Sequence, residues 1–224
     1  MNKIYPQSVA EISPLLDNAQ QAIAAGNFEQ ALSEVLPYLS STDIVLSTDA
    51  NRIAGLACFQ IKKYADAEQH WDAVVKAKSN ERWSDWFNLC TSATMNRNFI
   101  RGREAFETMV EMSKKTGKES DMWQTFANLI YYYMRALIDN SQYDAALEQL
   151  KKLADFYKSL PVTDRTYVVA ATGSFPPSLE DVLDAAKPIF EHMGKEKSTT
   201  WLKDFASKLD DEGKRFVENI ILST

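Results

Sequence analysis

Glycine and proline are scarce in this chain, with seven of each among 224 residues, together about half their average share of a protein sequence. A fold of many strands needs many tight turns, and so few glycines and prolines provide few of the residues that form them. They also leave few places for a glycine-rich loop that cradles a phosphate. The sequence therefore predicts an all-α protein.

Cysteine, histidine and catalytic motifs are also sparse or missing. The two cysteines, Cys58 and Cys90, fall inside apolar helical patterns without C-x-x-C spacing, which predicts two buried thiols and not a disulfide or metal framework. The two histidines, His70 and His192, are far apart in the chain, and no dinucleotide-binding, P-loop or zinc-protease motif occurs. We expect no enzymatic activity, no cofactor and no metal site.

Long apolar runs and an excess of basic charge are missing as well. No stretch approaches the roughly 18 apolar residues that a membrane span requires, and the first residues lack the apolar region of a secretion signal. The formal net charge is −6 at pH 7, whereas a nucleic-acid binder needs a concentrated Lys and Arg surface. We expect a cytoplasmic protein without a membrane partner, and the charge argues against a nucleic-acid partner.

What the sequence does contain is a recurring unit: an aromatic residue, a small residue three positions later, and an apolar residue four positions after that. Successive units begin 36, 35 and 44 residues apart. Two antiparallel helices approach closely only where a side chain is small, so the unit is typical of packed helix pairs. The four units occupy 28–35, 64–71, 99–106 and 143–150.

The stretch before the third unit adds a second pattern. Trp86, Leu89, Cys90 and Ala93 spell W-x-x-L-small-x-x-small. Together the two patterns resemble the tetratricopeptide repeat, a helix-turn-helix unit of about 34 residues. The resemblance implies an all-α, right-handed helical-repeat solenoid that forms a single domain over 1–224. Its repeats would occupy approximately 12–45, 48–81, 83–116 and 120–158.

The fourth repeat accounts for the longer spacing. Trp123 follows Trp86 by 37 residues, yet the turn comes only at 140–142. About seven extra residues, or two helical turns, therefore lie in its first helix, and we predict one long helix over 121–138. At least one of the three tyrosines at 131–133 should be exposed, because neighbouring side chains on a helix point about 100° apart.

Beyond residue 158 the pattern changes. We expect 159–177 to be an irregular connection or a short helix, capped by Thr163 and ended by Gly173. Ser178 and Asp181 resemble a capping box, and Pro188 should kink the helix that the box begins. We expect 178–224 to form C-terminal helices that cap the array, because an end repeat must cover its apolar face.

The resemblance also implies a binding groove, since the first helices of successive repeats in this family line a concave surface that holds a peptide or a partner helix. Aromatic, Arg, Met and amide side chains are typical of recognition surfaces. For Phe59 and Phe87, burial between repeats is an equally good interpretation. The expected solvent-facing groove residues are Arg52, Leu56, Phe59, Gln60, Phe87, Asn88, Thr91, Met95, Gln124, Asn128, Tyr131 and Tyr132.

Some members of the family hold the C-terminal carboxylates of chaperones with a clamp of Lys, Asn and Arg. Here Arg52 and Asn88 match two of those places by residue type, whereas Leu56, Asp121 and Thr125 do not. The Asp121 carboxylate would repel a bound carboxylate where the clamp needs a cation. The sequence therefore argues against binding of chaperone tails.

A second candidate surface is a basic edge, where Lys and Arg side chains fall at or just beyond equivalent turns of successive repeats. These side chains are either solvated turn residues or a docking site for an acidic partner. The residues of the basic edge are Lys62, Lys63, Arg97, Arg101 and Arg103.

These features predict a non-catalytic interaction module that binds a protein or peptide partner in the concave groove. By analogy alone, a secretion chaperone or an immunity protein that neutralises a toxin would fit. One alternative is a structural or assembly scaffold that self-associates through its end helices into a homo-oligomer. Another is an enzyme or small-ligand sensor with a pocket under 163–177.

Overall fold

Helices form every element in the part of the chain that the computed structural model describes. That part comprises 13–79, 81–115, 119–164, 166, 168–169 and 176–223, without the side chains of 113–115, 119–125 and 223. No strand occurs in these residues, which confirms the all-α prediction. The chain divides into two compact units, unit 1 (1–112) and unit 2 (113–224).

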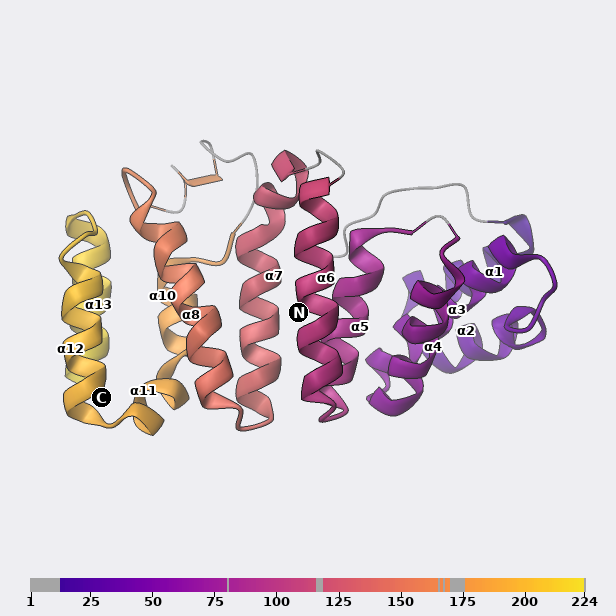
Figure 1. Ribbon diagram of the computed structural model, residues 1–224, viewed down its shortest axis with the longest axis horizontal. Coiled ribbons are helices and arrows are strands. Elements are labelled where there is room, and N and C mark those ends of the chain that lie inside the picture. Colours follow the sequence, from indigo (N-terminus) through magenta and orange to yellow (C-terminus); the bar gives the residue numbers. More distant parts are fainter. Residues whose placement is uncertain are drawn as a thin grey trace. The chain divides into compact units, whose positions relative to one another are not determined.

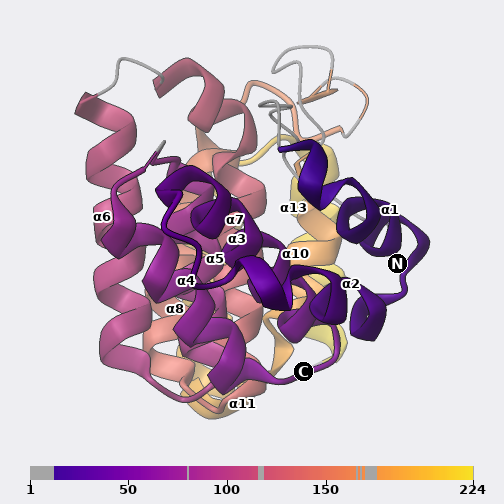
Figure 2. The same cartoon turned by 90° about the vertical axis from the view of Figure 1, so that its right-hand side faces the viewer.

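Unit 1 is built from successive helices that pack against their neighbours in the sequence. Helix α1 packs on α2, α2 on α3, α3 on α4, and α4 on α5. Figures 1 and 2 both show α1 and α2 side by side. The elements are η1 (Pro14–Leu16), α1 (Asp17–Ala25), α2 (Phe28–Val35), η2 (Leu36–Tyr38), α3 (Ile44–Gln60), α4 (Tyr64–Ala77), α5 (Trp83–Met95) and α6 (Phe99–Lys115), whose last three residues extend past residue 112.

Unit 2 begins with a long helical hairpin in which α7 packs on α8 (Figure 1). Helix α11 packs on both α8 and α12, and α13 packs on α10 and α12. The C-terminal helices thus form connected layers on the hairpin. The elements are α7 (Glu119–Asp139), α8 (Tyr143–Lys158), α10 (Leu179–Ala185), α11 (Lys187–Met193), α12 (Lys195–Ala206) and α13 (Asp211–Ser223).

The same turn joins the two helices of each expected repeat. One residue of each turn has a left-handed φ, between 58° and 80°, and the next N–H donates to a carbonyl five residues earlier at 2.8–2.9 Å. This is the Schellman arrangement that ends helices. The turns are therefore spaced by the same 36, 35 and 44 residues as the aromatic positions. The left-handed residues are Gly26, Lys62, Arg97 and Ser141.

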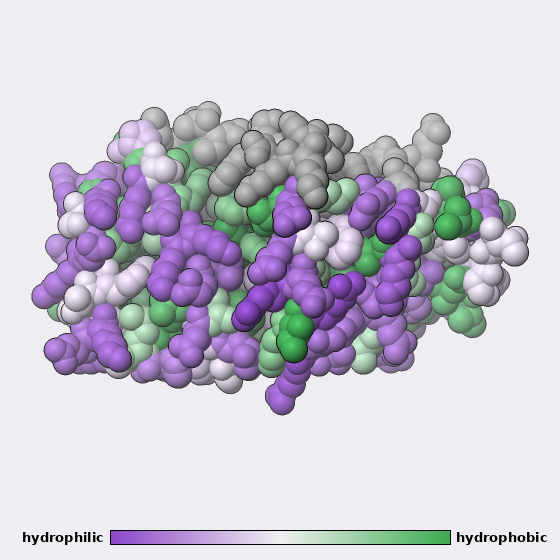
Figure 3. Space-filling model, in the orientation of Figure 1, coloured by the Kyte–Doolittle hydropathy of each residue, from purple (hydrophilic) through white to green (hydrophobic). Residues whose placement is uncertain are grey.

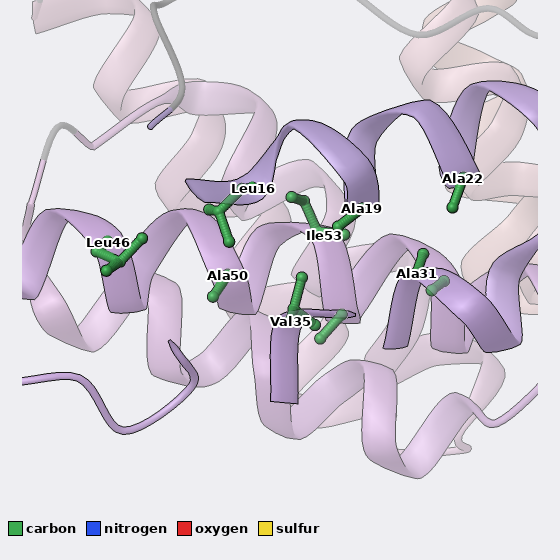
Figure 4. Close-up of a cluster of buried hydrophobic side chains, with 10 residues drawn as sticks. Leu16, Ala19, Ala22, Ala31, Val35, Leu46, Ala50 and Ile53 are labelled. Atoms are coloured by element: carbon green, nitrogen blue, oxygen red, sulfur yellow. The ribbon is translucent and has the colours of Figure 1, made fainter. Parts of the chain in front are cut away.

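Small side chains let the helices of unit 1 approach closely around one buried cluster. In Figure 4, side chains from α1, α2 and α3 point toward one another. Alanines separate the larger members, so the helices meet without a gap. The labelled residues are Leu16, Ala19 and Ala22 on the N-terminal side, Ala31 and Val35 from α2, and Leu46, Ala50 and Ile53 from α3.

Two glycines of unit 1 lie at close helix contacts. A Cβ at Gly55 would lie 2.7 Å from the Trp71 ring, so glycine lets α3 lie directly against that indole. A Cβ at Gly102 would collide with the Thr94 hydroxyl and lie 3.2 Å from the Cys90 carbonyl oxygen. The small position of the recurring unit therefore lies at a close helix contact, as the sequence predicted.

Two expectations for unit 2 are confirmed, the long helix and the capping box. Helix α7 covers the predicted long helix. The expected exposure of at least one of the three tyrosines is met only in part, because Tyr133 is buried and Tyr131 and Tyr132 are half-buried. The Ser178 hydroxyl accepts from the Asp181 N–H at 3.0 Å, and the Asp181 carboxylate accepts from the Ser178 N–H at 3.3 Å, which completes the capping box.

Pro188 has a stronger effect than the predicted kink. Helix α10 ends at Ala185, and a separate helix, α11, begins at Lys187 with Pro188 in its first turn. Proline has no N–H to donate and its ring clashes with the preceding turn, so the chain restarts a helix where proline is tolerated. One predicted helix is thus two.

The connection at 159–177 is tied to the C-terminal helices through Thr163. Its N–H donates to Asp210 Oδ2 at 3.1 Å, and its hydroxyl donates to Asp210 Oδ1. Part of the connection is helical, since the Val168 N–H donates to the Asp164 carbonyl at 2.9 Å. Gly173, the predicted end of this segment, lies outside the described residues.

The predictions for the cysteines are confirmed. Cys58 and Cys90 are free and buried, in unit 1, and burial raises the pKa of both thiols. No helix within the described ranges has the length and apolar character needed to cross a bilayer.

Candidate functional site

Arg52 was expected to face solvent in the groove, and this prediction is wrong. Its side chain is 8% exposed, and its Nη1 lies 2.7 Å from Asp49 Oδ1. Its Nε and Nη2 meet the two carboxylate oxygens of Asp85 at 3.1 and 2.8 Å. The Arg52 side chain therefore links α3 to the first turn of α5, because its guanidinium forms charged hydrogen bonds with one buried carboxylate from each helix.

This buried pairing raises the pKa of the guanidinium, which stays protonated. Burial acts to lower the pKa of Arg52, but its hydrogen bonds and charge interactions with Asp85 and Asp49 together raise the pKa by more. Asp85 also accepts from the Arg82 backbone N–H at 3.2 Å, which caps α5. The Arg52 guanidinium is thus a buried, paired cation that joins two helices, and it does not face solvent where a partner could contact it.

The other groove residues of unit 1 differ in accessibility. Thr91 is buried and its hydroxyl donates to the carbonyls of Phe87 and Asn88, so it does not face solvent either. Phe59 packs edge-on against Tyr64, with ring centroids 5.4 Å apart. Gln60 is exposed, and five more are half-buried: Leu56, Phe59, Phe87, Asn88 and Met95.

The basic edge in unit 1 is shorter than predicted. Arg101 is half-buried, and its Nη2 lies 2.6 Å from Asp72 Oδ1 on α4. Its guanidinium also lies 5.8 Å from the centroid of the Trp86 ring. An arginine held by a carboxylate and an indole adds little free positive charge. The predicted basic-edge residues that are exposed are Lys62, Lys63, Arg97 and Arg103.

In unit 2, helix α7 presents aromatic and cationic side chains toward solvent. Tyr131 and Tyr132 meet edge to face with centroids 5.7 Å apart, and the Arg135 guanidinium lies 5.8 Å from the Tyr131 ring centroid. Burial and the neighbouring Tyr131 raise the pKa of Tyr132, against an opposite effect of Arg135. Asn128 is half-buried, and the side chain of Gln124 lies outside the described part.

A cleft of about 410 Å³ adjoins this face of α7. The cleft is shallow and open to solvent. It is lined from the C-terminal half of α7 and from α10 and α11, and it combines apolar, aromatic and charged side chains. The lining residues are Tyr131, Arg135, Ile138, Asp139, Asp181, Asp184, Ala185 and Pro188.

The three carboxylates of the cleft are not equivalent. Asp181 is occupied in the capping box of α10, and Asp184 Oδ1 lies 2.8 Å from Lys187 Nζ. Asp139 is exposed at the end of α7. Nowhere within the described ranges do three His, Cys, Asp or Glu side chains form a group that could hold a metal ion.

Of the cleft residues, the sequence predicted only Tyr131 as a binding residue, while Asp181 and Pro188 were identified for the capping box and the kink. Arg135 could have been found from helical spacing, because it lies one turn after Tyr131 on the same face. Asp139, Asp184 and Pro188 carried no such signal. Their place in the cleft depends on how α10 and α11 pack in unit 2, which local pattern does not encode.

The chain matches no protein-family model, no curated protein and no solved structure.

Proposed function

We propose that this protein is a non-catalytic interaction module, built as a right-handed solenoid of tetratricopeptide-like repeats, that binds a protein or peptide partner through exposed faces of its first helices. The four Schellman turns at the repeat spacing support the repeat assignment. They bring the same backbone geometry to each helix pair, as stacked repeats require.

The observation that carries the binding proposal is the face of α7. Tyr131 and Tyr132 are only half-buried, and Arg135 is exposed beside them. Tyrosine and arginine are the residue types that dominate binding energy at protein interfaces, because they bury a large area and also donate hydrogen bonds. A cleft next to them adds a place for a protruding side chain.

This proposal is tested by capturing the partner from a lysate of the host with the full chain as bait. We expect one stoichiometric protein that is lost with Tyr131→Ala/Arg135→Ala and kept with a control, Lys151→Ala/Lys203→Ala, on exposed positions of α8 and α12. Equal capture by both variants would contradict binding at α7. Loss only with Lys62→Ala/Arg97→Ala would move the site to the basic edge.

Self-association as a scaffold is the second candidate, and exposed apolar side chains favour it. Leu222 on α13 is 85% exposed. In unit 1, Leu15, Leu36, Ile44 and Val45 are each more than half exposed, and Figure 3 shows hydrophobic patches over the part of unit 1 where α1 and α2 lie. The mass in solution, measured by light scattering over a range of concentrations, decides: a stable dimer favours the scaffold, and a monomer at all concentrations contradicts it.

A further inference from the structure

We propose that the cleft beside α7 receives a basic side chain, lysine or arginine, from an apolar segment of the partner. This inference rests on the proposed function and specifies the chemistry of the partner. On this proposal, the partner segment is selected by the acidic cleft and not by the basic edge.

The apolar wall of the cleft suits the aliphatic part of such a side chain. Ile138 from α7 and Ala185 and Pro188 from the opposite side line it. Lysine and arginine bury their methylene groups on apolar surface while the charged head stays with polar groups. An apolar neighbour in the partner segment would cover the accessible part of the half-buried Tyr131.

The charges around the cleft favour a cation. Three carboxylates line the cleft, Asp139, Asp181 and Asp184, against one lining cation, Arg135. Lys187 beside the cleft pairs with Asp184, and Asp181 is engaged in the capping box. An anionic side chain entering the cleft would be repelled above all by the exposed Asp139, whereas a cation would be attracted to it. Complementarity of this kind rejects the wrong partner as well as attracting the right one.

The single lining cation, Arg135, contacts an aromatic ring. The Arg135 guanidinium lies over the Tyr131 ring, and no ion pair between Arg135 and a lining carboxylate occurs among the described side chains. Lys187 engages Asp184 alone. The exposed carboxylate of Asp139 can therefore pair with an incoming cation. The carboxylate of Asp184 can pair with that cation and with Lys187 at the same time.

The test uses three fluorescein-labelled nonapeptides and the full chain. The first alternates leucine and lysine with alanine spacers, and the other two carry glutamate or glutamine in place of lysine. Fluorescence anisotropy at low salt measures each affinity. We expect the lysine peptide to bind at least about tenfold more tightly than the other two, because two exposed ion pairs together contribute about that much.

Site specificity is tested with Asp139→Asn/Asp184→Asn, which leaves the capping residue Asp181 intact. The control, Glu148→Gln/Asp155→Asn, removes two exposed carboxylates on α8 and changes the net charge equally. We expect about tenfold weaker binding of the lysine peptide to the cleft variant and an unchanged affinity for the control. Both variants must keep the wild-type circular dichroism spectrum.

Each other result has a defined meaning. Equal losses in the two double variants would show attraction by net charge and overturn the inference. Preference for the glutamate or glutamine peptide, with binding abolished by Tyr131→Ala, would overturn the basic-segment inference and leave the proposed function standing. Failure of all three peptides to bind, together with a host partner that Tyr131→Ala still captures, would overturn both.

Discussion

Arg52 and Asp85 form a two-pronged ion pair between α3 and α5, with Nε to Oδ1 at 3.1 Å and Nη2 to Oδ2 at 2.8 Å. Both side chains are less than one-tenth exposed. The pair joins α3 to α5, the first helices of two successive proposed repeats, so it constrains how these two helices lie relative to each other. Asp49, one turn before Arg52, provides the second carboxylate.

Removing the arginine should strongly destabilise unit 1. We expect Arg52→Ala to lower the free energy of unfolding by about 3–5 kcal/mol, because two carboxylates would stay buried without their cation. Urea unfolding followed by circular dichroism measures the loss. An Arg103→Ala variant, which removes an exposed arginine on α6, should change stability by less than about 0.5 kcal/mol. Similar losses in both variants would contradict a buried ion pair.

A side chain at Gly102 should separate α6 from α5. We expect Gly102→Leu to destabilise the protein by about 1–3 kcal/mol or more, because even a Cβ would collide with the Thr94 hydroxyl. The matched variant Arg103→Leu places the same side chain on the exposed neighbouring position and should be nearly neutral. A melting temperature unchanged by Gly102→Leu would refute this helix contact.

The left-handed turn residues predict a stabilising substitution. Arg97 has a φ of 63°, a conformation that glycine adopts without steric strain, so we expect Arg97→Gly to stabilise the protein by about 0.5–1 kcal/mol. Gly26→Ala, at a φ of 80°, should destabilise by a similar amount. Arg103→Gly, inside α6, should also destabilise. Chemical unfolding of the three variants gives the signs, and destabilisation by Arg97→Gly would contradict the turn geometry.

His70 should make stability depend on pH. Its Nδ1 lies 2.9 Å from Asn51 Oδ1, and the Asn51 amide nitrogen donates to the carbonyls of Leu39 and Ser47. Asn51 therefore presents its oxygen as an acceptor, and Nδ1 carries the proton of the neutral imidazole. Burial lowers the pKa of His70, against an opposing effect of Asp66.

The sign of the pH effect follows from that lowered pKa. The unfolded chain, with an ordinary histidine pKa of 6.5, takes up the proton before the folded chain does. The stability that neutral His70 contributes is present above pH 6.5 and is lost as the pH falls through the interval down to the folded-state pKa. Urea midpoints measured between roughly pH 8 and pH 5 should show this decline. The variant His70→Gln should lose this pH-dependent part of the stability, whereas His192→Gln should keep it.

The helices and their turns were predictable from the sequence because they depend on neighbouring residues. The spacing of Phe28, Tyr64, Phe99 and Tyr143 is also the spacing of the left-handed turns, since each turn lies two residues before its aromatic. Ser178 and Asp181 form their capping box within a single helical turn. The interruption at 188 was recognised, but its effect was underestimated, because a proline either kinks a helix or ends it according to how the flanking turns pack.

The surfaces were less predictable. Arg52 and Arg101 were expected to be exposed because an isolated helix gives no sign of the carboxylate opposite, and Asp85 and Asp72 come from neighbouring helices. The cleft has the same origin, since Asp184 and Pro188 follow Tyr131 by more than 50 residues and meet it only when α10 and α11 fold beside α7.

By itself, then, the sequence determined the all-helical class, the repeat spacing, the close-contact glycine at 102 and the buried thiols, because periodicity, backbone preference and side-chain volume act over a few residues. Only the tertiary structure decided which charges are paired and which remain accessible. Ion pairing requires two groups within about 4 Å, and that distance is set by helix packing, which joins residues that local sequence keeps apart.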